Sequence, residues 1–464
     1  MMSLFQHPIP WDKNLLSQYD MAGPRYTSYP TAPQFRNTFS EKALRNAIDR
    51  SNRSRRPLSL YFHIPFCDTL CFYCGCNKVV THNKNRALPY LHRMIQEMAL
   101  YAELVEPGRT VKQLHWGGGT PTFISTDEMS LLMKSTRRLF TLAPVDDGEF
   151  SVEIHPGRVS IDTMRHLRQL GFNRVSMGVQ DFDERVQVAV NRYNTLDQVS
   201  RLVNALREQH YRSISMDLIY GLPMQSLRSL QDTLHKVIDL QPDRLSIFNY
   251  AHLPHLFKSQ QLIHEADLPD ASEKLDMLQQ SIEQLQATGY VYIGMDHFAK
   301  PDDDLAIAQR EGRMQRNFQG YSTHGDCDLL AFGVSSISRI DNVYLQNAKE
   351  LNSYQQKLDM DMLPFERGFT LNTEDQLRRF IINQLICHFH LDFNEVLHQF
   401  GVDVRHHFSR ELERLTPMVE DGLLCLDEQR LQVNNAGRML IRRICMVFDE
   451  YLQTGEQIRY SKII

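Results

Sequence analysis

The sequence predicts an α/β protein built around an incomplete, TIM-like (β/α)6 barrel, with an N-terminal arm and a mostly α-helical C-terminal domain. Between residues 57 and 300, strand-like runs alternate with longer amphipathic runs, which is typical of a parallel sheet with crossover helices. Polar and glycine residues also follow each strand-like run directly. In barrels of this kind, functional groups collect at the carboxyl ends of the strands.

The expected strands occupy residues 58–64, 111–116, 150–154, 174–178, 214–219 and 244–249, with 291–294 as a further candidate to close the set. Apolar residues recur at helical spacing in the stretches 88–104, 127–139, 162–170, 227–240 and 272–287. We therefore expect an arm at 1–56, the partial barrel at 57–300, a barrel extension or connector at 301–369 and a helical, winged-helix-like cap at 370–464.

The end of the chain resembles a winged helix, because a hairpin-like run at 422–433 precedes an amphipathic helix at 436–451. Asp427 and Glu428 lie in the expected turn of that hairpin and would repel phosphates, which disfavours DNA binding. We interpret this segment as a cap that shields the barrel from solvent and oxygen.

Composition excludes several classes of partner. The chain has 464 residues, with 51 Lys and Arg against 56 Asp and Glu, a formal charge of −5. It therefore has no broad basic field for nucleic acid. No run approaches the roughly 18 apolar residues of a membrane span, and the first residues lack a signal-peptide pattern. We expect a soluble, cytoplasmic monomer that binds neither membrane nor nucleic acid, in a compartment where thiols stay reduced.

The most informative feature is a cluster of cysteines. Four of the eight fall within ten residues: Cys67, Cys71, Cys74 and Cys76. Thiolates this close repel one another unless a cation holds them, so the cluster indicates metal or iron–sulfur ligation, or redox chemistry. The other four are scattered singly and are interpreted as small core hydrophobes: Cys327, Cys387, Cys425 and Cys445.

Spacing decides between these chemistries. Structural zinc sites combine two C-x2-C pairs, and no second pair exists here. A redox C-x-x-C formed by Cys71 and Cys74 leaves Cys67 unexplained. The remaining reading is C-x3-C-x2-C, which wraps three thiolates around a [4Fe–4S] cluster and leaves one iron open for reaction.

With an aromatic residue, Tyr73, just before the last cysteine, this motif resembles the signature of the radical S-adenosylmethionine enzymes. The resemblance implies a cluster held by Cys67, Cys71 and Cys74, whose fourth iron chelates S-adenosylmethionine. One electron then cleaves that molecule to a 5′-deoxyadenosyl radical. The cofactor carries the difficult chemistry, and the protein positions it and excludes competing reactions.

The residues that follow the other expected strands suit such a site. Gly117-Gly-Gly-Thr-Pro121 follows the second strand, and residues without a Cβ let the backbone approach a ligand closely. Glu153 ends the third strand, where its carboxylate can accept from a ribose hydroxyl or from the methionine ammonium. A tight turn and a plain salt bridge are the alternative interpretations of these two features.

Further segments narrow the resemblance. Gly23-Pro-Arg-Tyr-Thr-Ser-Tyr-Pro30, the Cys74-Gly-Cys76 ending and the segments 114–122, 176–182, 217–223, 248–252 and 294–299 together resemble the family of oxygen-independent coproporphyrinogen III oxidases. This implies oxidative decarboxylation of two propionates of coproporphyrinogen III to vinyl groups, giving protoporphyrinogen IX in heme and porphyrin biosynthesis. An electron donor and an electron acceptor are implied, neither of them identified.

Two other classes stay open. Heme-trafficking relatives in the same superfamily lack both the N-terminal Gly-Pro-Arg-Tyr segment and the C-x-C ending, so a heme chaperone is the alternative. A zinc-stabilised interaction protein is the third hypothesis, which iron content after anaerobic reconstitution would separate from the others.

The family resemblance also implies two molecules of S-adenosylmethionine. The first would contact Tyr61, Gly118, Glu153 and Ile337, and the second Tyr73, Gly119, Thr120, Gln180, Arg192, Asp217 and Ala251. Catalytic roles are implied for Tyr61 and for Cys76, which the cluster does not need as a ligand. The substrate carries four propionates, and candidate partners for them are Arg25, Lys78 and the 316–319 segment.

One short stretch departs from the family pattern. His155 stands where the family has an acid, and Gly157 stands where it usually has Arg. This difference affects one wall of the expected site and leaves the cysteine motif untouched.

Overall fold

The computed structural model describes residues 9–452, and its chain forms two compact units. One unit consists of Phe35–Asp270 and Asp326–Thr370 and contains the cysteine loop. The other consists of the described parts of Met1–Gln34, Ala271–Gly325 and Leu371–Ile464. Each unit is therefore discontinuous in sequence, and the linear division into arm, barrel, connector and cap stays a prediction.

A sheet organises the first unit, with the strand order β9-β8-β7-β6-β4-β1-β14-β15-β16-β17. Neighbouring strands from β9 to β14 are parallel, for example β1 with β4 and β1 with β14. The expected strands are β1 (Leu58–Ile64), β4 (Thr110–Gly118), β6 (Glu149–Ile154), β7 (Arg174–Gln180), β8 (Ser213–Tyr220) and β9 (Arg244–Asn249). The α/β class with a parallel sheet is thus confirmed.

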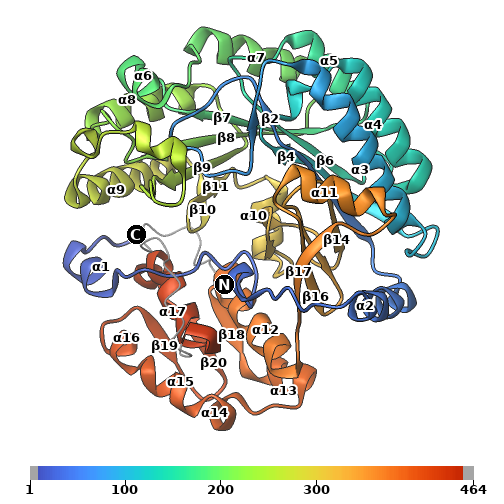
Figure 1. The fold of residues 1–464 in the computed structure, drawn as a ribbon. Helices are drawn as coiled ribbons and strands as arrows, with labels where there is room; N and C mark the ends of the chain where they lie inside the picture. Colours follow the sequence, from blue (N-terminus) through green and yellow to red (C-terminus); the bar gives the residue numbers. More distant parts are fainter. Residues whose placement is uncertain (1–8, 453–464) are drawn as a thin grey trace. The chain divides into compact units, whose positions relative to one another are not determined.

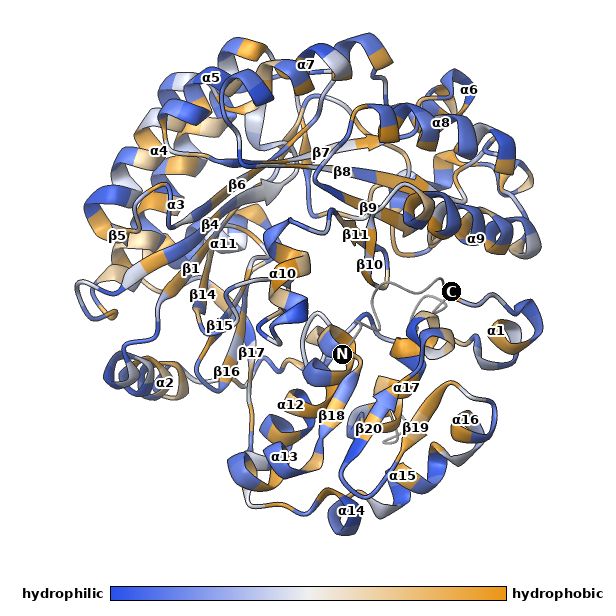
Figure 2. Cartoon of the chain, turned by 180° about the vertical axis from the view of Figure 1, so that it is seen from behind, coloured by the Kyte–Doolittle hydropathy of each residue, from blue (hydrophilic) through white to orange (hydrophobic). Residues whose placement is uncertain are grey.

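Helices precede and connect these strands and cover the sheet (Figure 1). They are α2 (Glu41–Ser54), α3 (Ala87–Ala102), α4 (Thr126–Leu139), α5 (Ile161–Gln169), α6 (Glu184–Val190), α7 (Leu196–Glu208) and α8 (Leu227–Asp239). Figure 2 shows hydrophobic and hydrophilic residues side by side on most of them. Helix α4 begins with a capping box between Ser125 and Glu128, which satisfies two backbone N–H groups that lack helical partners.

Helices α6 and α7 were not among the expected helices. Helix α6 is only seven residues long, and Asn191, which follows its last residue, has a φ of 53°. A capping box between Thr195 and Gln198 then starts α7. The left-handed backbone at Asn191 interrupts the helical spacing of apolar residues and divides it between two helices. Each helix is too short for this spacing to stand out in the sequence.

Much of the segment expected as a barrel extension or connector adds strands to the sheet. It supplies β14 (Asp328–Phe332), β15 (Ile337–Ile340), β16 (Val343–Asn347), helix α11 (Leu351–Asp359) and β17 (Phe365–Thr370). Strand β14 is buried along its length and lies parallel to β1, while β15, β16 and β17 continue antiparallel. A buried ion pair between Arg109 and Asp328, 2.7 Å apart, holds the amino end of β14.

Aromatic side chains fill the core between the sheet and its helices. Trp116 on β4 is fully buried and contacts Phe172 edge to face, with ring centroids 4.7 Å apart. Phe62 on β1 packs on Phe332 of β14 at 5.3 Å. Such pairs add to the free energy of burial, which fixes the strand positions below the site.

The second unit contains helices and short antiparallel strands. Its elements are α1 (Lys13–Tyr19), α9 (Ala271–Ala287), β10 (Val291–Gly294), β11 (His297–Ala299), α10 (Asp304–Arg310), β12 (Gln315–Asn317), β13 (Gly320–Ser322), α12 (Thr373–His388), β18 (His390–Asp392), α13 (Phe393–Phe400), α14 (Val404–His407), α15 (Ser409–Arg414), α16 (Thr416–Glu420), β19 (Leu424–Leu426), β20 (Arg430–Val433) and α17 (Ile441–Val447). The 291–294 candidate is a strand, but it pairs antiparallel with β11 in a hairpin.

The predicted hairpin near residue 430 is present as β19 and β20, which β18 extends to three strands. Asp427 lies in its turn and accepts hydrogen bonds from the backbone of Gln429 and Arg430, so the acid caps the turn. Residues 1–8 of the predicted arm and 453–464 of the predicted cap lie outside the described residues. Across residues 9–452, none of the helices combines the length and the apolar character that crossing a bilayer demands.

Candidate active site

A pocket of about 330 Å³ opens where the cysteine loop meets the carboxyl ends of β4, β6, β7 and β8. Most of the residues expected to bind the cluster or S-adenosylmethionine line it. Its wall contains Cys67, Cys71, Tyr73, Cys74, Cys76, Lys78, Gly118, Gly119, Thr120, Glu153, His155, Arg158, Ser176, Gly178, Gln180, Arg192, Asp217 and Phe248, among others. The parallel register accounts for this, because equivalent strand ends meet at one edge of a sheet.

Backbone hydrogen bonds hold the cysteine loop at both ends. Its first strand, β2 (Phe66–Cys67), pairs with β3 (Val79–Val80). In the middle of the loop, the N–H of Phe72 donates to the carbonyl of Val190 at 3.0 Å, and Asn191 Nδ2 donates to the carbonyl of Leu70 at 2.8 Å. The left-handed residue that ends α6 therefore also anchors the loop.

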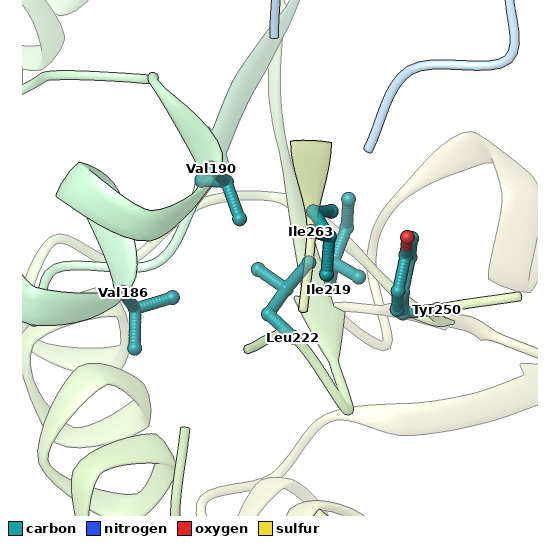
Figure 3. Close-up of a cluster of buried hydrophobic side chains, with 6 residues drawn as sticks. All are labelled: Val186, Val190, Ile219, Leu222, Tyr250 and Ile263. Carbon is teal, nitrogen blue, oxygen red and sulfur yellow. The ribbon is translucent and has the colours of Figure 1, made fainter. Parts of the chain in front are cut away.

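A hydrophobic cluster underlies the same loop (Figure 3). Phe72 and Tyr73 pack against it from the loop. Its buried members come from α6, from the end of β8 and from the segments that follow β8 and β9: Val186, Val190, Ile219, Leu222, Tyr250 and Ile263. Burying this apolar surface stabilises the loop without using the thiols, which leaves them free to face the pocket.

The thiols of the loop form no disulfide, and each has a polar neighbour. All eight cysteines of the chain are free of disulfides. Cys67 Sγ accepts from the Thr120 hydroxyl at 3.5 Å, and Cys71 Sγ accepts from Arg192 Nη1 at 3.6 Å. A hydrogen bond from Cys76 lowers the pKa of the Cys74 thiol and raises the pKa of Cys76.

These residues fit an iron–sulfur cluster better than a single metal ion. Within the described residues, no group of three or more His, Cys, Asp or Glu side chains converges on a point where one ion could bind. A cubane needs no such convergence, because each cysteine binds a different iron. Cys67, Cys71 and Cys74 line one pocket from one loop, which meets that requirement.

The glycines at the end of β4 let the backbone approach the cysteine loop. A Cβ on Gly119 would lie 2.5 Å from the carbonyl oxygen of Pro65, and Gly118 has a φ of +116°. The N–H of Gly119 donates to the carbonyl of Ile64 at 2.9 Å. Only glycine fits this close approach, so the turn itself requires Gly119, and its role in ligand binding stays a prediction.

Glu153 is held beside these glycines. It accepts from His115 Nε2 at 3.0 Å and from the N–H of Gly118 at 3.2 Å. Burial alone raises the pKa of this carboxyl, but the hydrogen bonds from His115 and Gly118 outweigh it and leave the pKa below its ordinary value. Glu153 is thus an anion that can accept from a cationic or hydroxyl donor in the pocket.

Gln180 provides the clearest sign of a missing partner. Its Oε1 is buried and has no hydrogen-bond partner in the described structure, although the side chain lines the pocket. Buried carbonyl oxygens without donors are rare in native proteins, and they indicate a ligand or ordered water. A ribose hydroxyl of S-adenosylmethionine would satisfy this atom.

Asp217 and Arg192 complete the far wall. Asp217 accepts from the Ser176 hydroxyl at 2.9 Å, and burial raises the pKa of its carboxyl to about 6. Arg192 is fixed by donating from Nε to the carbonyl of Gly178 at 2.9 Å. Its Nη2 donates to the same carbonyl, and Nη1 donates to the thiol of Cys71 at 3.6 Å.

Three expected ligand residues do not line the pocket. Tyr61 stacks on His115, with ring centroids 5.8 Å apart, and its hydroxyl contacts His63 Nδ1 at 3.1 Å. The carbonyl of Ala251 accepts from Gln260, whose amide also donates to the carbonyl of Tyr73. Ile337 begins β15. These residues therefore support wall residues or neighbouring strands.

The candidate propionate partners differ in their surroundings. Lys78 lines the pocket and donates to the carbonyl of Cys74 at 2.9 Å. In the other unit, Arg25 forms an ion pair with Asp296, and the guanidinium of Arg316 lies over the ring of Tyr321. The predicted roles of Arg25 and of the 316–319 segment stay predictions.

Some wall residues escaped the sequence reading. Ser176 and Gly178 alternate along β7 on the face that meets the pocket, and a strand period of two would have identified them. Arg158 follows β6 by four residues and carries no motif, so no local signal points to it.

Comparison with known proteins agrees with this geometry. The profile of the radical SAM superfamily matches residues 61–237, and the profile of the HemN C-terminal domain matches residues 371–440. The chain is 49% identical to the oxygen-independent coproporphyrinogen III oxidase of Pseudomonas aeruginosa, over 98% of this chain and 99% of that protein. Against the enzyme of Escherichia coli K12 it is 49% identical, with coverage of 98% and 99%.

A solved structure also matches. The coproporphyrinogen III oxidase HemN from Escherichia coli, described as a radical SAM enzyme, superposes with a TM-score of 0.91 at 48% sequence identity. The match covers 96% of this chain and all of that chain. The similarity thus includes both units and the whole cysteine region.

Proposed function

Because the chain belongs to the oxygen-independent coproporphyrinogen III oxidase family, we propose that it decarboxylates two propionates of coproporphyrinogen III to vinyl groups, giving protoporphyrinogen IX. It is a radical SAM oxidoreductase of porphyrin and heme biosynthesis, and its superfamily implies a [4Fe–4S] cluster and S-adenosylmethionine. The observation that carries the proposal is the pocket in which three thiols, the glycine turn and the unpartnered Gln180 carbonyl meet.

The reaction balances without oxygen. Each propionate loses CO2, one hydrogen atom from its β-carbon and one further electron, which passes to an acceptor. When bound, the cluster and S-adenosylmethionine supply the reducing electron and the hydrogen-abstracting radical. Deprotonating the unactivated β-carbon would need a far stronger base than any side chain here, whereas abstraction of a hydrogen atom develops little charge in a dry pocket.

The chain's own residues bind, orient and shield. Cys67, Cys71 and Cys74 would hold three irons, and the hydrophobic cluster below Phe72 and Tyr73 keeps their loop in place. Glu153 and Gln180 would accept from the ammonium and hydroxyl groups of S-adenosylmethionine. Arg192 would bind its carboxylate through Nη1, because Nε and Nη2 already donate to the carbonyl of Gly178.

Two molecules of S-adenosylmethionine are part of the proposal. The first would contact Tyr61, Gly118, Glu153 and Ile337, and the second Tyr73, Gly119, Thr120, Gln180, Arg192, Asp217 and Ala251. Equilibrium dialysis of the anaerobically reconstituted protein should give two bound per chain, and a plateau at one would remove the second site. Cys76 and Tyr61 keep their proposed catalytic roles, with Cys76 near the substrate.

The decisive experiment supplies coproporphyrinogen III, S-adenosylmethionine and a one-electron reductant to reconstituted enzyme without oxygen. Vinyl products support the oxidase, whereas heme binding without turnover would support a trafficking protein. Cys67→Ser should remove both the brown colour and the activity. The matched control is Cys425→Ser, because Cys425 is an exposed thiol of the other unit, and it should change neither.

A further inference from the structure

One wall of the pocket has donors that neither the fold nor the proposed ligand set uses. His155 and Arg158 follow β6 in a turn, where the N–H of Arg158 donates to the carbonyl of His155 at 3.0 Å. Both side chains line the pocket. Glu153 lines the same pocket, so the three side chains border one space.

The imidazole of His155 presents a hydrogen-bond donor. Its Nδ1 accepts from the N–H of Gly157 at 3.2 Å, so the ring proton is on Nε2. Although only 7% of His155 is exposed, Nε2 donates to no acceptor within the described residues. Burial and the nearby charges of Arg192 and Arg158 lower the pKa of His155 to about 2, which keeps the ring neutral.

Arg158 provides the charge. Its guanidinium makes no hydrogen bond or ion pair with the residues that the structure describes. The backbone explains why the cation stands at this position: a Cβ on Gly157 would lie 2.3 Å from the carbonyl oxygen of Tyr193. With this backbone a side chain at 157 would clash, and the cation of this chain stands one position later, at 158.

The carboxylates of the pocket are already engaged elsewhere. Asp68 forms an ion pair with Lys84, and Glu153 accepts from His115 and Gly118. Asp217 accepts from Ser176. A cation and an N–H donor therefore line the pocket with no carboxylate paired to either, which favours an anionic ligand.

We propose that His155 Nε2 and the Arg158 guanidinium form a carboxylate-binding subsite at the pocket wall. This inference rests on the proposed function, because that function supplies carboxylates from two sources. One source is a propionate of the tetrapyrrole, and the other is the methionine carboxylate of S-adenosylmethionine. The subsite binds one such group and so positions the ligand along the β6 side of the pocket.

Binding measurements on reconstituted protein test the subsite separately from turnover. The variant is Arg158→Ala, and Arg158→Lys retains the charge without the planar fork. Arg165→Ala is the matched control, since Arg165 is an exposed arginine of α5 that pairs with Asp162 outside the pocket. Arg158 is exposed as well, so its loss should leave the melting temperature unchanged.

Two ligand pairs identify the carboxylate. Coproporphyrin III is compared with its tetramethyl ester by fluorescence titration, and S-adenosylmethionine with its decarboxylated analogue by equilibrium dialysis. If Arg158 binds a propionate, Arg158→Ala lowers the affinity for coproporphyrin III about tenfold and leaves the affinity for the ester unchanged. A tenfold change is the expected effect of losing one charge-assisted hydrogen bond. If it binds the methionine carboxylate, the same loss appears for S-adenosylmethionine and not for its analogue.

Either result supports the subsite and names its ligand. The proposal is overturned if Arg158→Ala changes all four affinities by less than twofold, or changes each carboxylate and its carboxylate-free partner equally. Turnover by the wild-type protein is measured in parallel. Wild-type protein that binds both ligands but forms no vinyl product would contradict the proposed function and leave the subsite result standing.

Discussion

Glu97 on α3 predicts a pH dependence of stability. It is fully buried, and its carboxylate accepts from the N–H of Gly333 at 2.8 Å, from the Tyr354 hydroxyl at 2.7 Å and from Asn347 Nδ2 at 2.6 Å. Burial nevertheless dominates and raises the pKa of Glu97 from 4.5 to about 7. The folded protein therefore holds a proton that the unfolded chain releases at a lower pH.

The sign follows from proton linkage. Below pH 4.5 both states carry the proton, and well above pH 7 neither does, so the free energy of unfolding falls as the pH rises between these values. At about 1.4 kcal/mol per pH unit, the loss over this window is about 3 kcal/mol. Glu97→Gln cannot ionise, so it removes this part of the pH dependence.

The assay is denaturant unfolding of wild type and Glu97→Gln at pH values from about 4.5 to 8. Subtracting one from the other cancels every other titrating group, including His155. The wild type should lose about 3 kcal/mol relative to the variant across this range. A difference that stays constant within about 1 kcal/mol would refute the assignment of a protonated Glu97 in the folded state.

Three further predictions concern the site and the buried core. Gly119→Ala places a Cβ 2.5 Å from the Pro65 carbonyl oxygen, so it should displace the glycine turn. The affinity for S-adenosylmethionine, measured by dialysis, should fall at least tenfold. An unchanged affinity would contradict the close approach. Tyr90→Phe removes the hydrogen bonds to the His63 carbonyl and from the Val334 N–H. The free energy of unfolding in denaturant should fall by about 1–3 kcal/mol. A smaller loss would show that water replaces the Tyr90 hydroxyl at these two groups. Cys76→Ser should keep the iron–sulfur absorption and lose turnover, and loss of the absorption would make Cys76 a ligand.

The six parallel strands were predictable from local strand-like runs in the sequence. The residues at their ends were predictable as site residues because parallel sheets place function at one edge. The positions of β1 and β9 match the expected ranges, and β4, β6, β7 and β8 extend them by a few residues. The antiparallel strands β15 to β17 were not predicted, since their pairing depends on contacts with segments far along the chain. Helices α6 and α7 were missed for a local reason, the left-handed turn at Asn191.

Local spacing in the sequence determined the chemistry. Three cysteines in one short loop and three glycines at the end of one strand define which groups can hold a cluster and approach a ligand, and neighbours in the chain stay neighbours in space. Tertiary structure decided which side chains from distant parts of the chain meet in the pocket. Arg192 contacts Cys71 across 121 positions, and Gln180 has a buried oxygen without a donor. Such contacts depend on sheet register and helix packing, which no short stretch of sequence encodes.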